Sequence, residues 1–353
     1  MCASSTNIVT FNPGPSQIST ETLQAIKDIS TSGFLSQSHR SQTFMDVSRR
    51  AIEGLREKMK LPANYHIFYQ PSATVAMDTL LRNVVSQKSF HFVHGPFSSL
   101  FHQIAFGIGL EASLFESHLG QAVPWDKATI ASDTELIAVT HNETSTGLMW
   151  PNEEIHKLRN QYPQQLLAVD VTSSFGAMSM RWEDADLWFG SVQKCLGLPS
   201  GLGFLIVSPR AFEKAQAKRG MAPWQSFKFL AEKMKIYQTP ETPNMLNIAL
   251  LAHQMNAWNL PHIEAVLYKK ADMLYNPALE MHWKPFVTSH EWRSLTVTNF
   301  IVDKPMLWHE RAKQAHMILG EGYGTLKDTC IRIANFPAIS MKHLQKLLEV
   351  LSR

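Results

Sequence analysis

The stretch 189-FGSVQKCLGLPSGLGFLIV-207 places one charged residue, Lys194, among apolar and small side chains. No acidic residue stands between Phe189 and Val207 to pair with it. A buried ammonium group is costly unless it is paired, neutral or covalently used. Lys194 is therefore the first candidate for a chemical role, and the apolar runs at 185–192 and 202–208 predict strands on either side of it.

Further short apolar runs alternate with helical patterns through the first two thirds of the chain. Strands are predicted at 65–70, 90–94, 113–117, 136–142 and 164–173, and helices at 19–29, 38–61, 72–85 and 151–162. Parallel strands need crossover connections, which this alternation supplies. The pattern predicts an α/β fold with a mainly parallel sheet, of the seven-stranded type, covered by helices on both faces.

The last hundred or so residues differ from this pattern. Helical stretches at 245–260 and 263–274 precede two more polar strands at 293–302 and 328–336. We expect a large α/β domain at 16–255, and a small α+β domain that combines 1–15 with 256–353.

Composition narrows the class of protein. The chain has 353 residues, of which 44% are hydrophobic and 18% charged, and its formal net charge is +3. This is typical of a globular protein, and the lack of clustered basic residues argues against nucleic acid as a partner. No apolar run is long enough for a membrane span, and residues 1–16 lack a secretory signal pattern. Cys2, Cys195 and Cys330 have neither disulfide-framework nor metal-site spacing. We expect a cytoplasmic protein without a metal.

Polar residues follow several of the predicted strands, where open α/β sheets bind ligands. Asp170 ends one strand, residues 142–144 follow another, and Gln193 and Lys194 follow a third, while 72–74 open a helix. Each has an ordinary structural explanation, since Asp170 can cap a following helix and Lys194 can extend to solvent.

Taken together, these residues match the needs of pyridoxal phosphate chemistry. That cofactor requires a lysine for covalent attachment and proton transfer, and a carboxylate that keeps the pyridine nitrogen protonated. It also requires a helix N-terminus for its phosphate and an aromatic ring for stacking. Lys194, Asp170, the helix start at 72–74 and Phe97 supply all four.

Several motifs occur in an order that resembles the class V, fold-type I aminotransferases, which depend on pyridoxal phosphate. They are "SATVAMD" (72–78), "THNETSTG" (140–147), "VDVTSSFGAMSM" (169–180), "GSVQKCLGLPSGLGFLIVSP" (190–209) and "YQTPETPN" (237–244). The resemblance covers nearly the whole chain. It implies pyridoxal phosphate as cofactor, an amino acid and a 2-oxo acid as substrates, and a homodimer with shared active sites.

The same resemblance implies residue roles. Lys194 becomes the Schiff-base lysine, Asp170 the partner of the pyridine nitrogen, and Thr144 the hydrogen-bond donor to the ring 3-oxygen. Phe97 becomes the stacking residue. The other cofactor contacts, mostly to the phosphate, are Ser72, Ala73, Thr74, either Ser191 or Ser173, Gln193, and Thr239 from the partner subunit.

The residue before the lysine separates branches of the class. Gln193 resembles the aminotransferases and not the desulfurases, which carry histidine there, and Cys330 in a strand-like run is expected to be a buried structural thiol. The segment "SHRSQTF" (38–44) and the opening "FNPGPSQIS" are similar to the phosphoserine aminotransferase family. This implies that His39 and Arg40 bind a substrate phosphate, and that Arg332 binds the substrate carboxylate.

That reading implies phosphoserine and 2-oxoglutarate as substrates, and a place in serine biosynthesis. Two alternatives remain open. The motifs "THNETSTGLMWP" and "SSFGAMSM" look as much like alanine–glyoxylate or serine–pyruvate aminotransferases, and Lys327 is the only cation where a second phosphate-binding pair is expected. A non-catalytic protein that kept the fold is the alternative of another class. For Arg40, pairing with Asp46 or solvent is the ordinary explanation.

Overall fold

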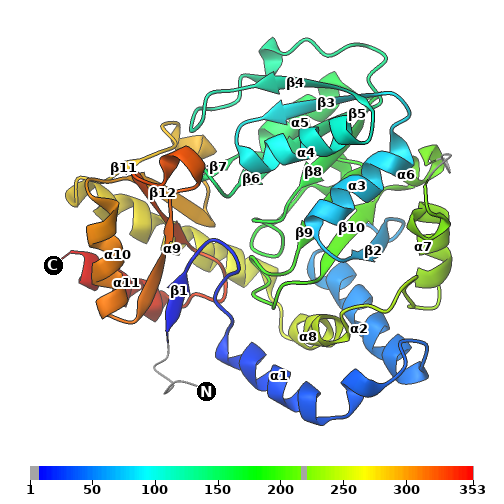
Figure 1. Cartoon of the computed structure of the whole chain (residues 1–353), viewed down its shortest axis with the longest axis horizontal. Helices are drawn as coiled ribbons and strands as arrows, with labels where there is room; N and C mark the ends of the chain where they lie inside the picture. Colours follow the sequence, from blue (N-terminus) through cyan, green and yellow to red (C-terminus); the bar gives the residue numbers. More distant parts are fainter. Residues whose placement is uncertain (1–7, 216–220, 353) are drawn as a thin grey trace.

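The computed structural model describes residues 8–215 and 221–352, and its larger sheet has seven strands (Figure 1). In spatial order these are β2 (His66–Gln70), β10 (Gly203–Val207), β9 (Leu187–Ser191), β8 (Leu166–Asp170), β5 (Leu136–Thr140), β3 (Lys88–Val93) and β4 (Glu111–Glu116). Strand β10 is antiparallel to both of its neighbours, and every other neighbouring pair is parallel. The predicted mainly parallel sheet is confirmed.

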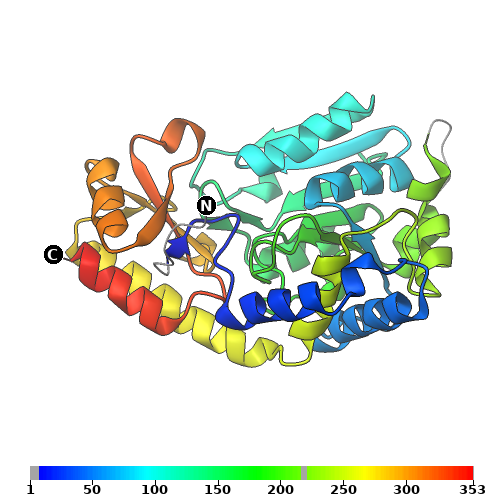
Figure 2. The ribbon, with the colours of Figure 1, turned by 60° about the horizontal axis from the view of Figure 1, so that its bottom comes forward.

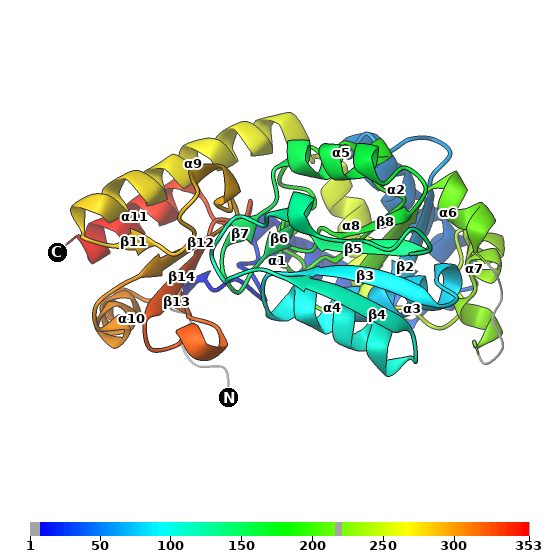
Figure 3. The same ribbon diagram turned by 90° about the horizontal axis from the view of Figure 1, so that it is seen from above.

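Helices cover both faces of this sheet, and the central strands β5, β8 and β9 are accordingly apolar up to their last residues, which are polar. Along β8, Leu167 and Val169 pack on one face, and Leu166 and Ala168 pack on the other. Figure 3 shows the resulting layers. One face carries α3 (Ala73–Val84), α4 (Pro96–Gly107), α6 (Pro209–Lys214) and α7 (Phe227–Met234), and the other carries α1 (Thr20–Thr31), α2 (Gln42–Lys58), α5 (Asn152–Gln161) and α8 (Met245–Met255).

A second sheet stands beside the first (Figure 2). Its five strands, in spatial order, are β1 (Val9–Phe11), β13 (Met317–Glu321), β14 (Cys330–Ala334), β12 (Val297–Ile301) and β11 (Lys284–Pro285). The remaining helices are α9 (Leu260–Glu280), α10 (Pro305–Gln314) and α11 (Met341–Leu351), and β6 (Asn142–Glu143) pairs with β7 (Leu148–Met149) in a short hairpin. Strand β1 joins this sheet, which favours the predicted division into a large domain at 16–255 and a small domain that combines 1–15 with 256–353. The domain boundaries themselves stay a prediction. Residues 1–7, with Cys2, lie outside the described residues.

One predicted helix boundary is wrong. The helical stretch expected at 245–260 ends at Met255, and a new helix starts at Leu260. Asn259 explains the new start, because its side chain accepts a hydrogen bond from the backbone N–H of His262 at 3.2 Å, and Pro261 fits the first turn of a helix. Within 8–215 and 221–352, no helix is long and apolar enough to cross a membrane.

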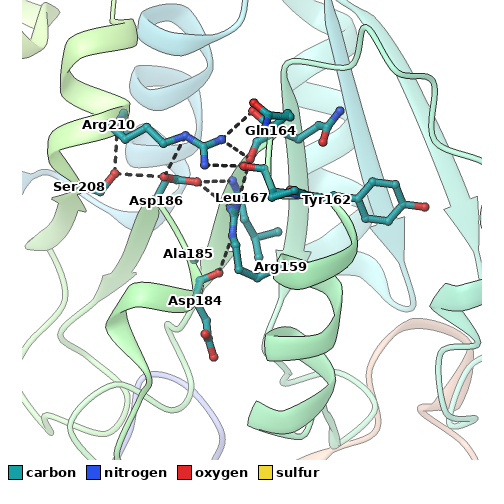
Figure 4. A network of polar contacts seen from close by, with 12 residues as sticks. Arg159, Tyr162, Gln164, Leu167, Asp184, Ala185, Asp186, Ser208 and Arg210 are labelled. Atoms are coloured by element: carbon teal, nitrogen blue, oxygen red, sulfur yellow. Dashed lines mark hydrogen bonds and ion pairs between the residues drawn. The ribbon is translucent and has the colours of Figure 1, made fainter.

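A buried ionic network holds together the ends of β8, β9 and β10 that lie far from the carboxyl edge of the sheet (Figure 4). Asp186, just before β9, accepts hydrogen bonds from Arg159 Nη2 at 2.7 Å and from the backbone N–H of Leu167 in β8 at 3.0 Å. Ser208, just after β10, donates to the same carboxylate at 3.2 Å. The side chains of Arg159 and Asp186 are only 12% and 9% exposed, so water does not screen this pair.

We expect Asp186→Ala to lower the free energy of unfolding by about 3–5 kcal/mol, because it leaves the buried Arg159 guanidinium without its counter-charge. Urea denaturation followed by circular dichroism measures the loss. The exposed Arg181–Glu153 pair, at 3.1 Å, supplies the control, and Glu153→Ala should cost about 1 kcal/mol or less. Equal effects of the two substitutions would show that the network does not stabilise the strands.

Candidate active site

A cavity of about 270 Å³ lies at the carboxyl ends of β5, β8 and β9, between the first turns of α3 and α4. Nine residues predicted to contact a cofactor line it together, namely Ser72, Ala73, Thr74, Phe97, Thr144, Asp170, Ser173, Gln193 and Lys194. Ser191, the alternative to Ser173, also lines it. Residues predicted from separate stretches of the sequence therefore line the same cavity.

Asp170 is the last residue of β8 and is 5% exposed. Its Oδ1 accepts hydrogen bonds from the backbone N–H and the hydroxyl of Thr172, at 2.8 and 2.5 Å. Residues 172–174 form a turn, so the reading of Asp170 as the cap of a following helix is wrong. Burial raises the pKa of Asp170 to about 6, although the bonds from Thr172 oppose the shift.

Lys194 follows the end of β9 and turns its amine into the same cavity. Its Nζ donates a hydrogen bond to the Pro13 carbonyl at 2.6 Å and lies 5.8 Å from the centre of the Phe97 ring. Burial, and then the nearby Arg332 charge, lower the pKa of Lys194 to about 8. The amine is therefore easier to deprotonate, and more nucleophilic near neutral pH, than an ordinary lysine.

The Pro13–Gly14 segment also belongs to the site, because Pro13 accepts the hydrogen bond from Lys194 and Gly14 lines the cavity. The sequence did not indicate this role, since glycine and proline predict only a turn. A Cβ atom on Gly14 would lie 2.3 Å from Lys194 Nζ, so the close approach of the lysine requires glycine there. The sequence around Gly14 shows only that it lies between two prolines ahead of the first helix. That pattern does not predict a contact with a residue as distant in the chain as Lys194.

The N-terminus of α3 offers an anion site built from backbone N–H groups and hydroxyls. Ser72 caps the helix by accepting from the Val75 N–H at 3.2 Å, and the Ala73 N–H donates to Ser191 Oγ at 2.7 Å. Free N–H groups and the helix dipole favour a phosphate at this position. Of the two serines left open, Ser191 lies at this helix, whereas Ser173 Oγ lies 2.5 Å from Thr144 Oγ1.

Three buried polar atoms of the cavity residues have no hydrogen-bond partner within the described residues: Thr140 Oγ1, Asn142 Oδ1 and Gln193 Oε1. Buried polar atoms in folded proteins are nearly always paired. Their gathering around one cavity therefore indicates a polar ligand.

Arg332 approaches from the other sheet and contacts Thr144, a residue that lines the cavity, although Arg332 itself does not line it. It lies on β14, and its Nη1 donates to the Thr144 carbonyl at 3.0 Å, while Nε donates to the Glu321 carbonyl at 2.7 Å. Burial lowers the pKa of Arg332 to about 10, which leaves it cationic at neutral pH. Its Nη2 has no partner in the described parts of the chain and is available to a carboxylate.

Like Arg332, the other predicted substrate and cofactor contacts, His39, Arg40 and Thr239, do not line this cavity. They form a separate cluster with the segment 238–242. Arg40 Nη1 donates to the Thr239 carbonyl at 2.9 Å, and His39 Nδ1 lies 3.5 Å from Thr242 Oγ1. The proposed pairing of Arg40 with Asp46 is wrong, because Asp46 lies 3.6 Å from Arg49 instead.

Three further residues are placed by their contacts. Lys327 Nζ lies 3.1 Å from the Glu321 carboxylate, so its charge is already paired. Cys330 is fully buried on β14, which confirms the reading as a structural thiol. Cys195 is also buried, and burial raises the pKa of its thiol, so neither cysteine is an activated nucleophile.

The residues present fit pyridoxal phosphate. Lys194 would hold the carbonyl end of the cofactor, Asp170 the ring nitrogen, Phe97 the ring face, and the start of α3 with Ser191 the phosphate. The three unpaired polar atoms are further candidates for contacts with it. When bound, this cofactor supplies an electron sink for cleavage of a bond at the substrate Cα.

Comparison with known proteins agrees with this geometry. Residues 8–310 match the family model "Aminotransferase class-V". A phosphoserine aminotransferase of Corynebacterium glutamicum (strain R) is 30% identical, with 96% of this chain and 92% of that protein covered. One of Rhodococcus jostii (strain RHA1) is 28% identical over the same shares.

Solved structures give the same result. The crystal structure of a phosphoserine aminotransferase from Cytophaga hutchinsonii superposes with a TM-score of 0.95 at 34% identity and covers 99% of both chains. An alanine–glyoxylate aminotransferase from Nostoc sp. reaches a TM-score of 0.84 at 20% identity, which shows a shared fold alone. This chain therefore belongs to the class-V aminotransferase family, and it is a pyridoxal phosphate-dependent enzyme with the fold-type I architecture.

Proposed function

We propose that the enzyme transfers the amino group of phosphoserine to 2-oxoglutarate, as a phosphoserine aminotransferase of serine biosynthesis. The observation that carries the proposal is that two cationic groups stand apart. Arg332 lies beside the cavity, where it donates to the carbonyl of Thr144 and its charge acts on Lys194, and the pair His39–Arg40 lies in the cluster with 238–242. A substrate with a carboxylate at one end and a phosphate at the other needs two such groups. The named relatives support the same substrate.

The residues of the cavity divide the work of the transfer. Arg332 holds the substrate carboxylate, which orients the Cα–H bond toward the reacting face. Lys194, with its lowered pKa, would act as the base that accepts the substrate Cα proton at its Nζ. Asp170 keeps a negative charge beside the ring nitrogen. Phe97, which lines the cavity, would cover one face of the cofactor ring and exclude water from that side.

A homodimer with shared sites is part of the proposal. His39, Arg40 and Thr239 cluster outside their own cavity, as expected if they complete the cavity of a second copy. The non-catalytic alternative loses support, because the lysine, the aspartate and the carboxylate-binding arginine converge on one site. Cytoplasmic location stays a prediction.

One observation favours a second candidate function. Among the described residues that line the cavity, Lys194 is the only cation, and the amine of Lys327 is paired with Glu321. A cavity that receives no cation from a second copy would suit a small amino acid without a phosphate. That is the alanine–glyoxylate or serine–pyruvate type of reaction.

The pH dependence of cofactor attachment tests the role of Lys194. Its amine attacks a carbonyl only when unprotonated, so the rate of attachment to the apoenzyme should rise with pH and level off above about 8. Stopped-flow absorbance measures this rate. Arg332→Leu removes a positive charge that disfavours protonation, so the midpoint should move upward, and Lys194→Ala should show no attachment. A wild-type midpoint near the ordinary lysine value of 10.5 would contradict the assignment.

Substrate choice and the shared site are tested with one set of variants. Half-reactions with phosphoserine, serine and alanine, followed by cofactor absorbance, should favour phosphoserine in the wild type. Arg40→Ala should lower kcat/KM for phosphoserine by about 10–100-fold, because a charge-assisted phosphate contact is lost, and leave that for alanine nearly unchanged. A preference for alanine in the wild type would establish the second candidate instead.

Mixing the inactive Lys194→Ala protein with Arg40→Ala protein then separates sharing from a contact within one chain. In a shared site, each mixed dimer has one cavity with its own lysine and the partner's arginine, so an equal mixture recovers about a quarter of wild-type activity toward phosphoserine. No recovery above the two separate variants would show that Arg40 serves its own cavity.

A further inference from the structure

Glu143 is a fully buried carboxylate next to the cavity, although it does not line it. It precedes Thr144, the residue proposed to contact the ring 3-oxygen, in the β6 hairpin. Across from it begins α4, whose first turn carries the stacking residue Phe97. The hairpin and the start of this helix lie side by side in Figure 1.

The contacts of Glu143 join these two segments. Its Oε2 accepts from the Ser98 N–H at 3.0 Å and lies 3.2 Å from Ser98 Oγ. Its Oε1 accepts from the Phe97 N–H at 3.4 Å and from the Ser145 hydroxyl at 2.6 Å. The groups around both oxygens are donors, which is the environment of a carboxylate at the positive end of a helix.

The helix start is built to admit this carboxylate. Gly95 precedes the first turn of α4, and a Cβ atom there would lie 2.4 Å from Glu143 Cγ and 2.5 Å from Cδ. Any larger residue would push the carboxylate away from the N–H groups of 97 and 98. His94, just before Gly95, is fully buried, and its ring contacts the Thr140 carbonyl at 3.0 Å through Nε2; no hydrogen bond joins this ring to Glu143 within the described residues.

From this arrangement we propose that Glu143 is a positioning residue for the cofactor: it fixes Phe97 and Thr144 relative to one another, so that the ring is held between a stacking face and a hydrogen-bond donor. The inference rests on the proposed roles of those two residues. Glu143 itself touches neither cofactor nor substrate. Its removal therefore weakens cofactor binding by loosening both neighbours at once.

The test measures the affinity of apoenzyme for pyridoxal phosphate by fluorescence titration, with the thermal midpoint of each apoprotein recorded beside it. Glu143→Gln replaces an accepting oxygen by an NH2 group that faces donors, and Gly95→Ala displaces the carboxylate from the other side. Each should weaken affinity by about 10–100-fold. Ser145→Ala removes one donor only and should weaken it less, by about threefold to tenfold.

Glu154→Gln is the matched control. Glu154 also lies in the first turn of a helix, α5, where it accepts from Trp125 Nε1 at 2.7 Å, and it does not line the cavity. Its variant should keep wild-type affinity. In a Phe97→Ala background, Glu143→Gln should cost less affinity than it does alone, because part of its effect passes through Phe97.

Affinity within about twofold of wild type in folded Glu143→Gln and Gly95→Ala overturns the proposal, since twofold is below the effect of one lost charge-assisted bond. If the Glu143→Gln protein does not fold, the Ser145→Ala protein is used in its place. An unchanged affinity of the Ser145→Ala protein for pyridoxal phosphate then also overturns the proposal. A lowered thermal midpoint with unchanged affinity assigns Glu143 a purely structural role. Wild-type protein that does not bind the cofactor would instead refute the proposed site itself.

Discussion

The structure depends on keeping a buried amine and a buried carboxylate at one cavity without a direct ion pair between them. Asp170 is the last residue of β8, Lys194 follows the end of the adjacent parallel strand β9, and each is desolvated. The amine bonds instead to the Pro13 carbonyl, and the carboxylate to Thr172. Burial pushes the two pKa values toward neutrality from opposite sides, to about 8 and about 6. A pyridine ring placed between the two groups satisfies both.

The rest of the fold keeps these two groups at a fixed spacing. At the opposite ends of the same strands, Asp186 connects β8, β9 and β10 through Arg159, Leu167 and Ser208 (Figure 4). Strands that cannot slide at one end present their other ends in register. The second sheet contributes differently, because Arg332 reaches from β14 to the Thr144 carbonyl and places a cation beside the cavity, close enough to act on Lys194.

Local pattern predicted the parts of the site that follow strands and start helices. Asp170, Lys194 and Ser72 each stand where a short apolar run ends, so their positions at one sheet edge follow from strand order. The resemblance to a known family supplied their roles. Long-range approaches could not be predicted in this way.

The contact between Gly14 and Lys194 joins segments far apart in the chain, and so does the pairing of the three-residue strand β1 with β13. Neither contact produces a periodic pattern of apolar residues in the sequence. The same holds for the bonds of Arg40 to 238–240 and for the clamp of Glu143 on α4. These depend on how whole elements pack, and β1 is too short to show an alternation of its own.

Reduction of the cofactor-loaded enzyme with borohydride, followed by peptide mapping, tests the central claim most directly, because it fixes the cofactor to whichever lysine holds it. We expect the label on Lys194 alone. Lys270 is the informative competitor, since it is 2% exposed and burial also lowers its pKa to about 8, although its amine bonds to the carbonyls of Phe336 and Ile339. A label on Lys270, or on any lysine other than Lys194, would contradict the account.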